Sequence, residues 1–177
     1  MFKKILIANR GEIALRILRA CRELNIKTVA IHSEADENAM HVRLADESVC
    51  VGPPKAQLSY LNIPAIITAA TMTNVDAIHP GYGFLSENPD FVDASETAGI
   101  TFIGPDANSM RKLGSKIRAR KIAISVNVPV MPATGPLTNN EEKIKSVARD
   151  ITYPLMVKAT WGCGGRGMRI VSSEKEL

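Results

Sequence analysis

The sequence of 177 residues has few cysteines, few aromatic residues and no long apolar run. Three widely spaced cysteines are too few for a disulfide framework, so we expect a reducing, cytoplasmic compartment. No apolar stretch approaches the roughly 20 residues that span a bilayer, so no membrane helix is expected. The short run Ile5–Ala8 is interrupted at Asn9, too early for a secretory leader, and is predicted to be a first strand.

Acidic residues are absent from one segment. Six cations and no acid lie between Arg111 and Lys121, within a chain of net charge +4. A nucleic-acid surface would interleave aromatic side chains for stacking, and this segment has none. A solvated basic helix is therefore favoured, and no nucleic-acid partner is expected.

Short apolar, β-branched runs alternate with helical patterns along the first hundred residues. The expected strands are Ile5–Ala8, Thr28–His32, Ser48–Val51, Val75–His79 and Thr101–Ile103. Most are apolar on both faces, as parallel strands covered by helices are. The alternation predicts an α/β fold with a Rossmann-like, doubly wound parallel sheet.

Helix signals fall between these strands. The first expected helix has an apolar stripe of Ile13, Ile17, Cys21 and Leu24. Asn62 is expected to cap a second helix and Asn88, followed by proline, a third that stops at Gly99. Cys21 and Cys50 are expected to be buried, which leaves Cys163 as the exposed cysteine. Neither His32 nor His41 has a second ligand at metal spacing, so no metal site is predicted.

A change of composition predicts a domain boundary near residue 114. The segment Gly104–Leu113 opens a short helical turn, and a helix over about Ser115–Ser125 precedes a proline-rich connection. We assign residues 1–113 to a first domain and 114–177 to a second, incomplete one. Ser173–Glu176 has the spacing of a capping box, so a further helix is expected there and the chain is expected to be cut inside its second domain.

The segment Lys158–Arg169 carries the most chemistry. A lysine closes an apolar run, four glycines fall within the next nine residues, and Met168–Val171 is predicted to be a returning strand. Glycine readily adopts positive φ, so successive N–H groups can converge on an anion, and lysine adds a charge suited to phosphate. The pattern predicts a hinged lid over nucleotide phosphates; the alternative for Lys158 is an ordinary strand-end lysine.

Four segments, in order, resemble biotin carboxylase: Asn9–Ala14, Ser59–Ala65, His79–Asn88 and Gly164–Met168. The resemblance implies a pre-ATP-grasp N-terminal domain followed by the truncated start of an ATP-grasp domain. In that family ATP and bicarbonate form carboxyphosphate, and the carboxyl group passes to biotin on a carrier protein. The resemblance implies that the catalytic groups and the Mg²⁺ ligands belong to sequence beyond residue 177, so this chain alone is expected to be inactive.

The resemblance also implies site residues. Those matched to the ATP site are Lys116, Lys158, Gly164, Gly165 and Met168. Tyr82 and Gly83 match the edge of the biotin and bicarbonate pocket, and Arg19 and Glu23 match a homodimer contact. Trp161 and Cys163 stand where the family has glycines and are expected to hinder lid closure. Asn127 also replaces a glycine.

The implied partners are a biotin carboxyl carrier protein or domain and a carboxyltransferase component. Acetyl-CoA carboxylase, with a role in fatty acid biosynthesis, is one parent enzyme that fits. Propionyl-CoA and pyruvate carboxylases share this region, so the acceptor stays open. Two alternatives from other classes stay open as well: a non-catalytic βαβ module that binds a partner, and another ATP-grasp ligase with a different acceptor.

Overall fold

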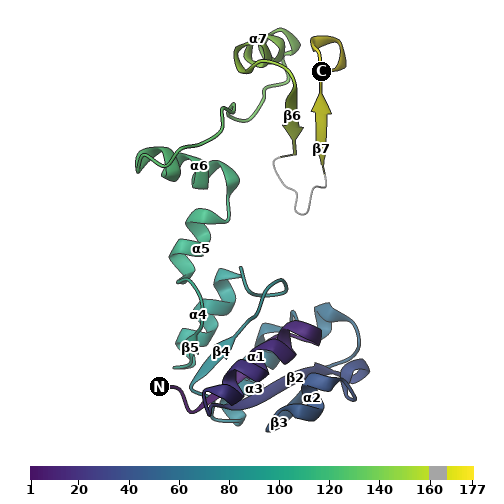
Figure 1. Ribbon diagram of the computed structural model, residues 1–177, viewed down its shortest axis with the longest axis vertical. Coiled ribbons are helices and arrows are strands. Elements are labelled where there is room, and N and C mark those ends of the chain that lie inside the picture. The colour runs from purple at the N-terminus through teal and green to yellow at the C-terminus, as the bar shows by residue number, and fades with distance from the viewer. Residues whose placement is uncertain (160–166) are drawn as a thin grey trace. The chain divides into compact units, whose positions relative to one another are not determined.

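The computed structural model describes residues 1–159 and 167–177, and the chain forms two compact units, Met1–Gly114 and Ser115–Leu177. The first unit contains a five-stranded sheet in the order β3-β2-β1-β4-β5, with every neighbouring pair parallel (Figure 1). Its strands are β1 Lys4–Ile7, β2 Lys27–Ser33, β3 Glu47–Gly52, β4 Ala77–His79 and β5 Thr101–Phe102. The predicted parallel α/β sheet is confirmed.

Helices cover both faces of this sheet because the side chains of each strand alternate between them. Leu6 of β1 and Ala8 just after it pack with the helices α3 (Ile63–Met72) and α4 (Pro89–Thr97), whereas Ile5 and Ile7 pack with α1 (Gly11–Glu23). The helices of the first unit are α1 Gly11–Glu23, α2 Met40–Leu44, α3 Ile63–Met72, α4 Pro89–Thr97 and α5 Ala107–Leu113, with 3₁₀ turns at Glu34–Asp36 and Ala56–Leu58. No helix in the described part of the chain is long and apolar enough to cross a membrane.

The order in which strands are added to the sheet reverses at the central strand, β1. From β1 the chain adds β2 and β3 on one side, and then β4 and β5 on the other. In open α/β sheets, ligands bind beyond the carboxyl ends of the strands where this reversal occurs. The reversal lies between β1 and β4, so a ligand site is expected at the segments that follow Ile7 and His79.

The predicted helix caps are confirmed in the first unit. The Asn62 side chain accepts a hydrogen bond from the Ala65 amide at 3.2 Å, and Asn88 accepts from the Asp90 and Phe91 amides at 2.9 and 3.2 Å. α4 ends two residues before Gly99, which has φ +72°, as a helix C-terminus often requires.

Two burial predictions were wrong. Leu24 is 57% exposed, because α1 ends at Glu23 and Leu24 lies beyond the buried stripe. Cys50 is also exposed, because β3 is an edge strand whose alternate residues face solvent. Cys50 is therefore an accessible thiol.

The second unit contains the helices α6 Lys116–Ser125 and α7 Glu141–Ile151 and an antiparallel hairpin of β6 Leu155–Lys158 and β7 Met168–Val171. The predicted returning strand is confirmed. Asn127 follows α6 with φ +59°, a left-handed conformation that asparagine tolerates better than most residues and that glycine adopts freely. The backbone conformation at Asn127 is therefore one that both asparagine and glycine can adopt.

The helix predicted from Ser173 is only a 3₁₀ turn, Glu174–Glu176. The Ser173 side chain makes no capping hydrogen bond, and the Glu176 carboxylate instead accepts from the Ser172 amide at 2.8 Å. The predicted capping box is therefore not formed. Glu174 pairs with the Arg149 guanidinium of α7 through two hydrogen bonds of 2.7 Å, which ties the turn to the helix.

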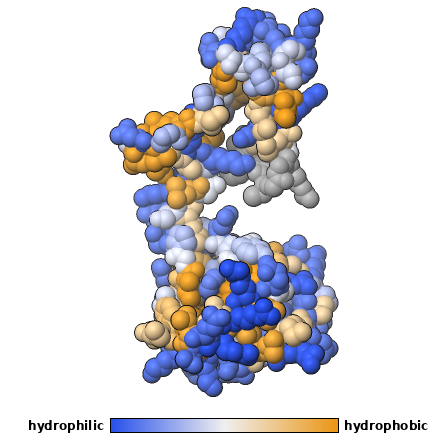
Figure 2. All heavy atoms as spheres, in the orientation of Figure 1, coloured by the Kyte–Doolittle hydropathy of each residue, from blue (hydrophilic) through white to orange (hydrophobic). Residues whose placement is uncertain are grey.

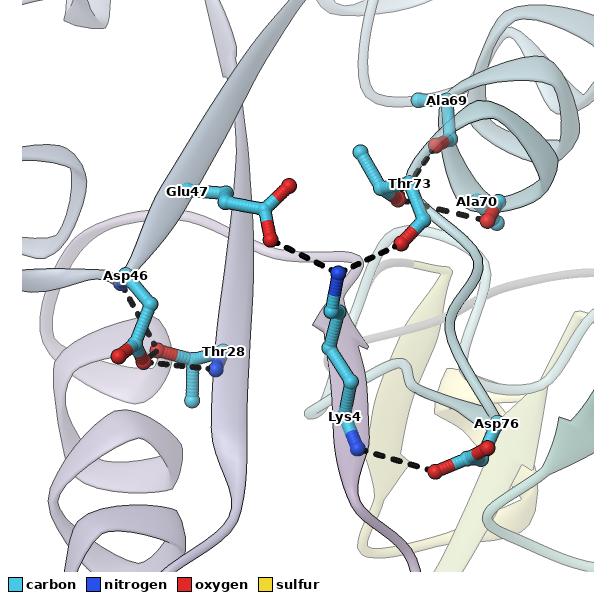
Figure 3. Close-up of polar contacts among 8 residues, drawn as sticks. All are labelled: Lys4, Thr28, Asp46, Glu47, Ala69, Ala70, Thr73 and Asp76. Atoms are coloured by element: carbon cyan, nitrogen blue, oxygen red, sulfur yellow. Dashed lines mark hydrogen bonds and ion pairs between the residues drawn. The ribbon is translucent and has the colours of Figure 1, made fainter.

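Polar contacts at the amino edge of the sheet join its strands to neighbouring turns (Figure 3). The Lys4 ammonium donates to Glu47 Oε1 and to the Thr73 carbonyl, both at 2.8 Å. The Asp76 carboxylate accepts from the Lys4 amide at 3.0 Å. Just before β3, Asp46 Oδ2 accepts from the Thr28 amide of β2 at 2.9 Å. These contacts hold the starts of β1, β2 and β3 together.

We expect the Asp46 carboxylate to make a contribution to stability that is lost in acid. The hydrogen bonds from Thr28 lower the pKa of the Asp46 carboxyl, so its stabilisation is complete above the unfolded value of about 3.9 and is lost as pH falls through the folded value. Because the group is largely solvated, we expect Asp46→Asn to remove about 0.5 kcal/mol of the difference in unfolding free energy between neutral and acid pH. Urea titrations measure this, with exposed Asp150→Asn as control; equal acid sensitivity of both variants would refute the prediction.

Candidate functional site

A turn after β4 is held by a side chain that follows β1. The Asn9 amide is 3% exposed and donates to the carbonyls of Pro80 at 2.7 Å and Tyr82 at 2.8 Å. Its Oδ1 accepts from the Arg10 amide at 2.9 Å. A single buried amide thus joins the segments that begin at Asn9 and at His79, at the predicted switch point of the sheet.

Glycine is required at the centre of this turn. Gly81 has φ +64°, and a Cβ there would lie 2.8 Å from Asn9 Nδ2. Its N–H donates to His79 Nδ1 at 3.1 Å. Burial lowers the pKa of His79, so at neutral pH the imidazole is neutral and can accept this bond. Gly83 has φ +70° but nothing within 4 Å of its Cβ position.

The turn borders a hollow of about 300 Å³. Its lining residues are Asn9, Arg10, Glu12, Ile13, Tyr82, Gly83 and Phe84. Tyr82 is 60% exposed, and its hydroxyl donates to the Glu12 carboxylate, which raises the pKa of the phenol. An amide, a guanidinium, a carboxylate and a phenol around one small hollow can orient a polar ligand by hydrogen bonds.

A larger hollow, of about 730 Å³, lies at the opposite ends of the strands, where they begin. Met1, Leu24, Asp76 and Thr101 are among its lining residues. These residues lie at the amino ends of the strands or in the turns that precede them, whereas ligands of open α/β sheets bind beyond the carboxyl ends. The smaller hollow at Tyr82 is therefore the candidate site of the first unit.

Asp36 is an important residue here that the sequence did not indicate. It lies in the polar segment Ser33–Asn38, which looks like a solvated loop, yet it is 9% exposed. Its carboxylate pairs with the Arg10 guanidinium at 2.7 Å and accepts from the Tyr60 hydroxyl at 2.6 Å. Burial and this carboxylate raise the pKa of Tyr60 to about 12. Only the fold brings these three residues together, so no local signal could have identified Asp36.

The hairpin of the second unit pairs two of the predicted ATP residues. Lys158 lies directly opposite Met168, and Met156 opposite Ile170, so these four side chains share one face of the hairpin. Met156 and Met168 are each 44% exposed and Ile170 is 65% exposed. The pairing continues toward the loop, where the Ala159 amide donates to the Gly167 carbonyl at 2.7 Å. The result is an open apolar face with one ammonium group.

The remaining predicted residues lie elsewhere. Lys116 is the exposed first residue of α6, a different element from the hairpin. Arg19 and Glu23 are exposed and one turn apart on α1. Gly164 and Gly165, together with Trp161 and Cys163, lie outside the described residues. Within residues 1–159 and 167–177, no group of three or more His, Cys, Asp or Glu side chains is placed to hold a metal ion.

Apolar side chains are exposed on the second unit. α6 has no buried residue, and Ile117 and Ile124 are 37% and 52% exposed. Figure 2 shows an apolar patch over this helix. Patches of this kind are typical of surfaces that contact another part of a protein or a partner.

Comparison with known protein families gives two matches. The biotin carboxylase N-terminal domain matches residues 1–110, and the ATP-binding domain of the carbamoyl-phosphate synthase L chain matches residues 115–177. The biotin carboxylase of Haemophilus influenzae is 57% identical over 178 residues, which cover all of this chain and 40% of that protein. The chain thus spans about two fifths of the length of that curated relative.

Solved structures give the same result. A biotin carboxylase from Campylobacter jejuni in complex with β-γ-ATP has a TM-score of 0.92 and 47% identity, over 100% of this chain and 40% of that one. The biotin carboxylase domain dimer of the 2-oxoglutarate carboxylase from Hydrogenobacter thermophilus, solved with MgADP, ADP and bicarbonate, has a TM-score of 0.89 and 45% identity, over 99% of this chain and 39% of that one.

Proposed function

Because this chain belongs to the biotin carboxylase family, we propose that it is the N-terminal part of an ATP-dependent ligase that carboxylates biotin with bicarbonate. The biotin would be carried on a partner protein or domain. The first unit would be the N-terminal domain and the second the beginning of the ATP-grasp domain. The observation that carries this proposal is the hairpin face on which Lys158 lies opposite Met168.

The hairpin face fits a nucleoside triphosphate. Met156, Met168 and Ile170 offer exposed apolar surface to a purine ring, and Lys158 lies at the loop end of the same face, where its charge can meet a phosphate. We propose the same phosphate role for Lys116, Gly164 and Gly165. ATP, when bound, would supply the phosphoryl group that activates bicarbonate, while these residues bind and orient it.

Mg²⁺ takes oxygen ligands, usually one or two carboxylates together with substrate phosphates and waters. Within the described residues, no group of three or more His, Cys, Asp or Glu side chains is placed to hold a metal ion. We therefore assign no step to the metal in this chain and expect its ligands beyond residue 177. For the same reason we expect the 177-residue chain by itself to have no carboxylase activity.

The hollow at Tyr82 fits the acceptor side of the reaction. We propose that Tyr82 and Gly83 form one edge of the pocket for biotin and bicarbonate. The ureido ring of biotin is small and polar, and the hollow presents both hydrogen-bond donors and acceptors to such a group. The two hydrogen bonds from Asn9 fix the turn, and a fixed turn can hold the ureido ring in one orientation for reaction.

We propose further that Arg19 and Glu23 contribute to a homodimer contact and that the enzyme works in the cytoplasm with a carrier and a carboxyltransferase. Both residues are exposed on α1 and free to contact a second copy. The apolar patch on α6 would be covered by the rest of the ATP-grasp domain. Acetyl-CoA carboxylase, and with it fatty acid biosynthesis, is one assembly that fits.

The function can be tested on the complete gene product. We expect biotin-dependent ATP cleavage, and we expect Lys158→Met to weaken binding of a non-hydrolysable ATP analogue by about 10- to 100-fold, because a charged hydrogen bond to phosphate is worth roughly 1.5–3 kcal/mol. Calorimetry measures the affinity. Lys143→Met, an exposed lysine on α7, is the matched control. Equal affinity of both variants would remove Lys158 from the site, and ATP cleavage that ignores biotin would refute the proposed acceptor.

A further inference from the structure

A buried polar cluster lies beneath the turn that carries Tyr82. Asp36 Oδ1 accepts from Arg10 Nη2 at 2.7 Å, and Asp36 Oδ2 accepts from the Tyr60 hydroxyl at 2.6 Å and from Ser33 Oγ at 3.2 Å. The Tyr60 oxygen in turn accepts from the Ser33 amide at 3.0 Å. The Tyr60 hydroxyl therefore has both a donor and an acceptor partner, which fixes its position from two sides.

The ring of Tyr60 supports the turn directly. It stacks on Phe84 with centroids 5.1 Å apart and ring planes 10° from parallel, and the Arg10 guanidinium carbon lies 5.6 Å from the Tyr60 centroid. Tyr60 is 1% exposed, whereas Phe84 is 37% exposed. The buried ring is thus a fixed platform on which a surface aromatic side chain rests.

Phe84 needs such a platform because its backbone is strained. It has φ +39°, in the left-handed region that a bulky L-residue rarely adopts. Residues of this kind persist only where the surrounding contacts determine their conformation. Phe84 follows Tyr82 and Gly83 directly, so release of its ring would change the direction in which those two residues face the hollow.

We propose that Asp36 and Tyr60 are positioning residues for the Tyr82 turn. The carboxylate holds the phenol, the phenol ring holds Phe84, and Phe84 keeps Tyr82 and Gly83 at the rim of the hollow. Neither Asp36 nor Tyr60 lines the hollow, so they act on a bound molecule only through lining residues that they contact: Phe84 of the turn, and Arg10. That the bound molecule is biotin rests on the proposed function.

The variant that isolates this role is Tyr60→Phe, which removes the hydroxyl and keeps the ring. In the 177-residue chain we expect amide hydrogen exchange of residues 81–84 to rise about tenfold, with a smaller rise in the amides of β1. In the complete gene product, assayed with free biotin, we expect the KM for biotin to rise about tenfold and the KM for ATP to stay unchanged. The matched control is Tyr153→Phe, because the buried Tyr153 hydroxyl has no hydrogen-bond partner among the described residues.

Two other outcomes would contradict the inference or its link to biotin. Exchange in residues 81–84 that rises no more than in β1 would overturn the inference and leave Tyr60 with a role in stability alone. Faster exchange of the turn with an unchanged KM for biotin would support the positioning role and refute the assignment of the turn to biotin. Phe84→Leu changes a more exposed side chain and should reproduce the faster exchange if Tyr60→Phe fails to fold.

Discussion

Gly81→Ala is expected to destabilise the first unit by about 3 kcal/mol. The added Cβ would lie 2.8 Å from Asn9 Nδ2, so the amide must move away from the two carbonyls that it bonds. Those bonds contribute about 1 kcal/mol each, and the left-handed conformation costs a further 1–2 kcal/mol for a residue with a side chain. Hydrogen exchange of the slowest amides of β1 and β2 measures the change, because they report on global opening.

Gly83→Ala is the matched control for this prediction. Gly83 has a similar φ, +70°, but nothing lies within 4 Å of its Cβ position, so only the conformational cost of about 1–2 kcal/mol applies. In an Asn9→Ala background the difference between the two glycine substitutions should shrink, since the clashing amide is gone and only the contacts with Ile13 Cγ1 at 3.0 Å and the residue 9 Cβ at 3.3 Å remain. Equal costs in the native background would show that Asn9 does not constrain Gly81.

Phe91→Ala is expected to cost about 3–5 kcal/mol of unfolding free energy. Phe91 is 0% exposed and meets the Phe102 ring edge-on, with centroids 5.8 Å apart, so its removal leaves a cavity between α4 and β5. Urea unfolding followed by circular dichroism measures the loss. Phe2→Ala is the control, because Phe2 is 36% exposed and should cost under about 1 kcal/mol. Similar losses for both variants would mean that α4 closes over the cavity.

The fold of the first unit could be predicted because its signals are local. Apolar runs marked all five strands, and asparagine caps marked α3 and α4. The sequence failed where position in the sheet decided the outcome: Cys50 sits in an apolar run, but only the strand order shows that β3 is an edge. The helix predicted after Ser173 is only a short turn for a different reason: Glu176 accepts from the Ser172 amide, so the predicted capping box with Ser173 does not form.

The candidate site could be predicted only in part. The resemblance to biotin carboxylase implied Tyr82, Gly83, Lys158 and Met168. Tyr82 and Gly83, adjacent in the chain, both line the hollow, and the hairpin places Lys158 opposite Met168. Asp36 gave no such signal, and Asn9, although it begins one of those segments, was assigned no supporting role, because a buried polar side chain is recognisable only from its partners. Those partners come from elements distant in sequence, as the separations of 24 positions between Asp36 and Tyr60 and 71 between Asn9 and Pro80 illustrate.

The two ends of the parallel strands in the first unit have different roles. Hydrogen bonds of Lys4, Asp46 and Asp76 join the strands at their amino ends, while the Tyr82 turn lies at their carboxyl ends. An affinity tag, a fluorophore or a surface anchor attached at Met1 would therefore sit far from the hollow. Efforts to make the protein more heat-resistant can likewise concentrate on the Lys4 edge and leave the ligand-facing turn untouched.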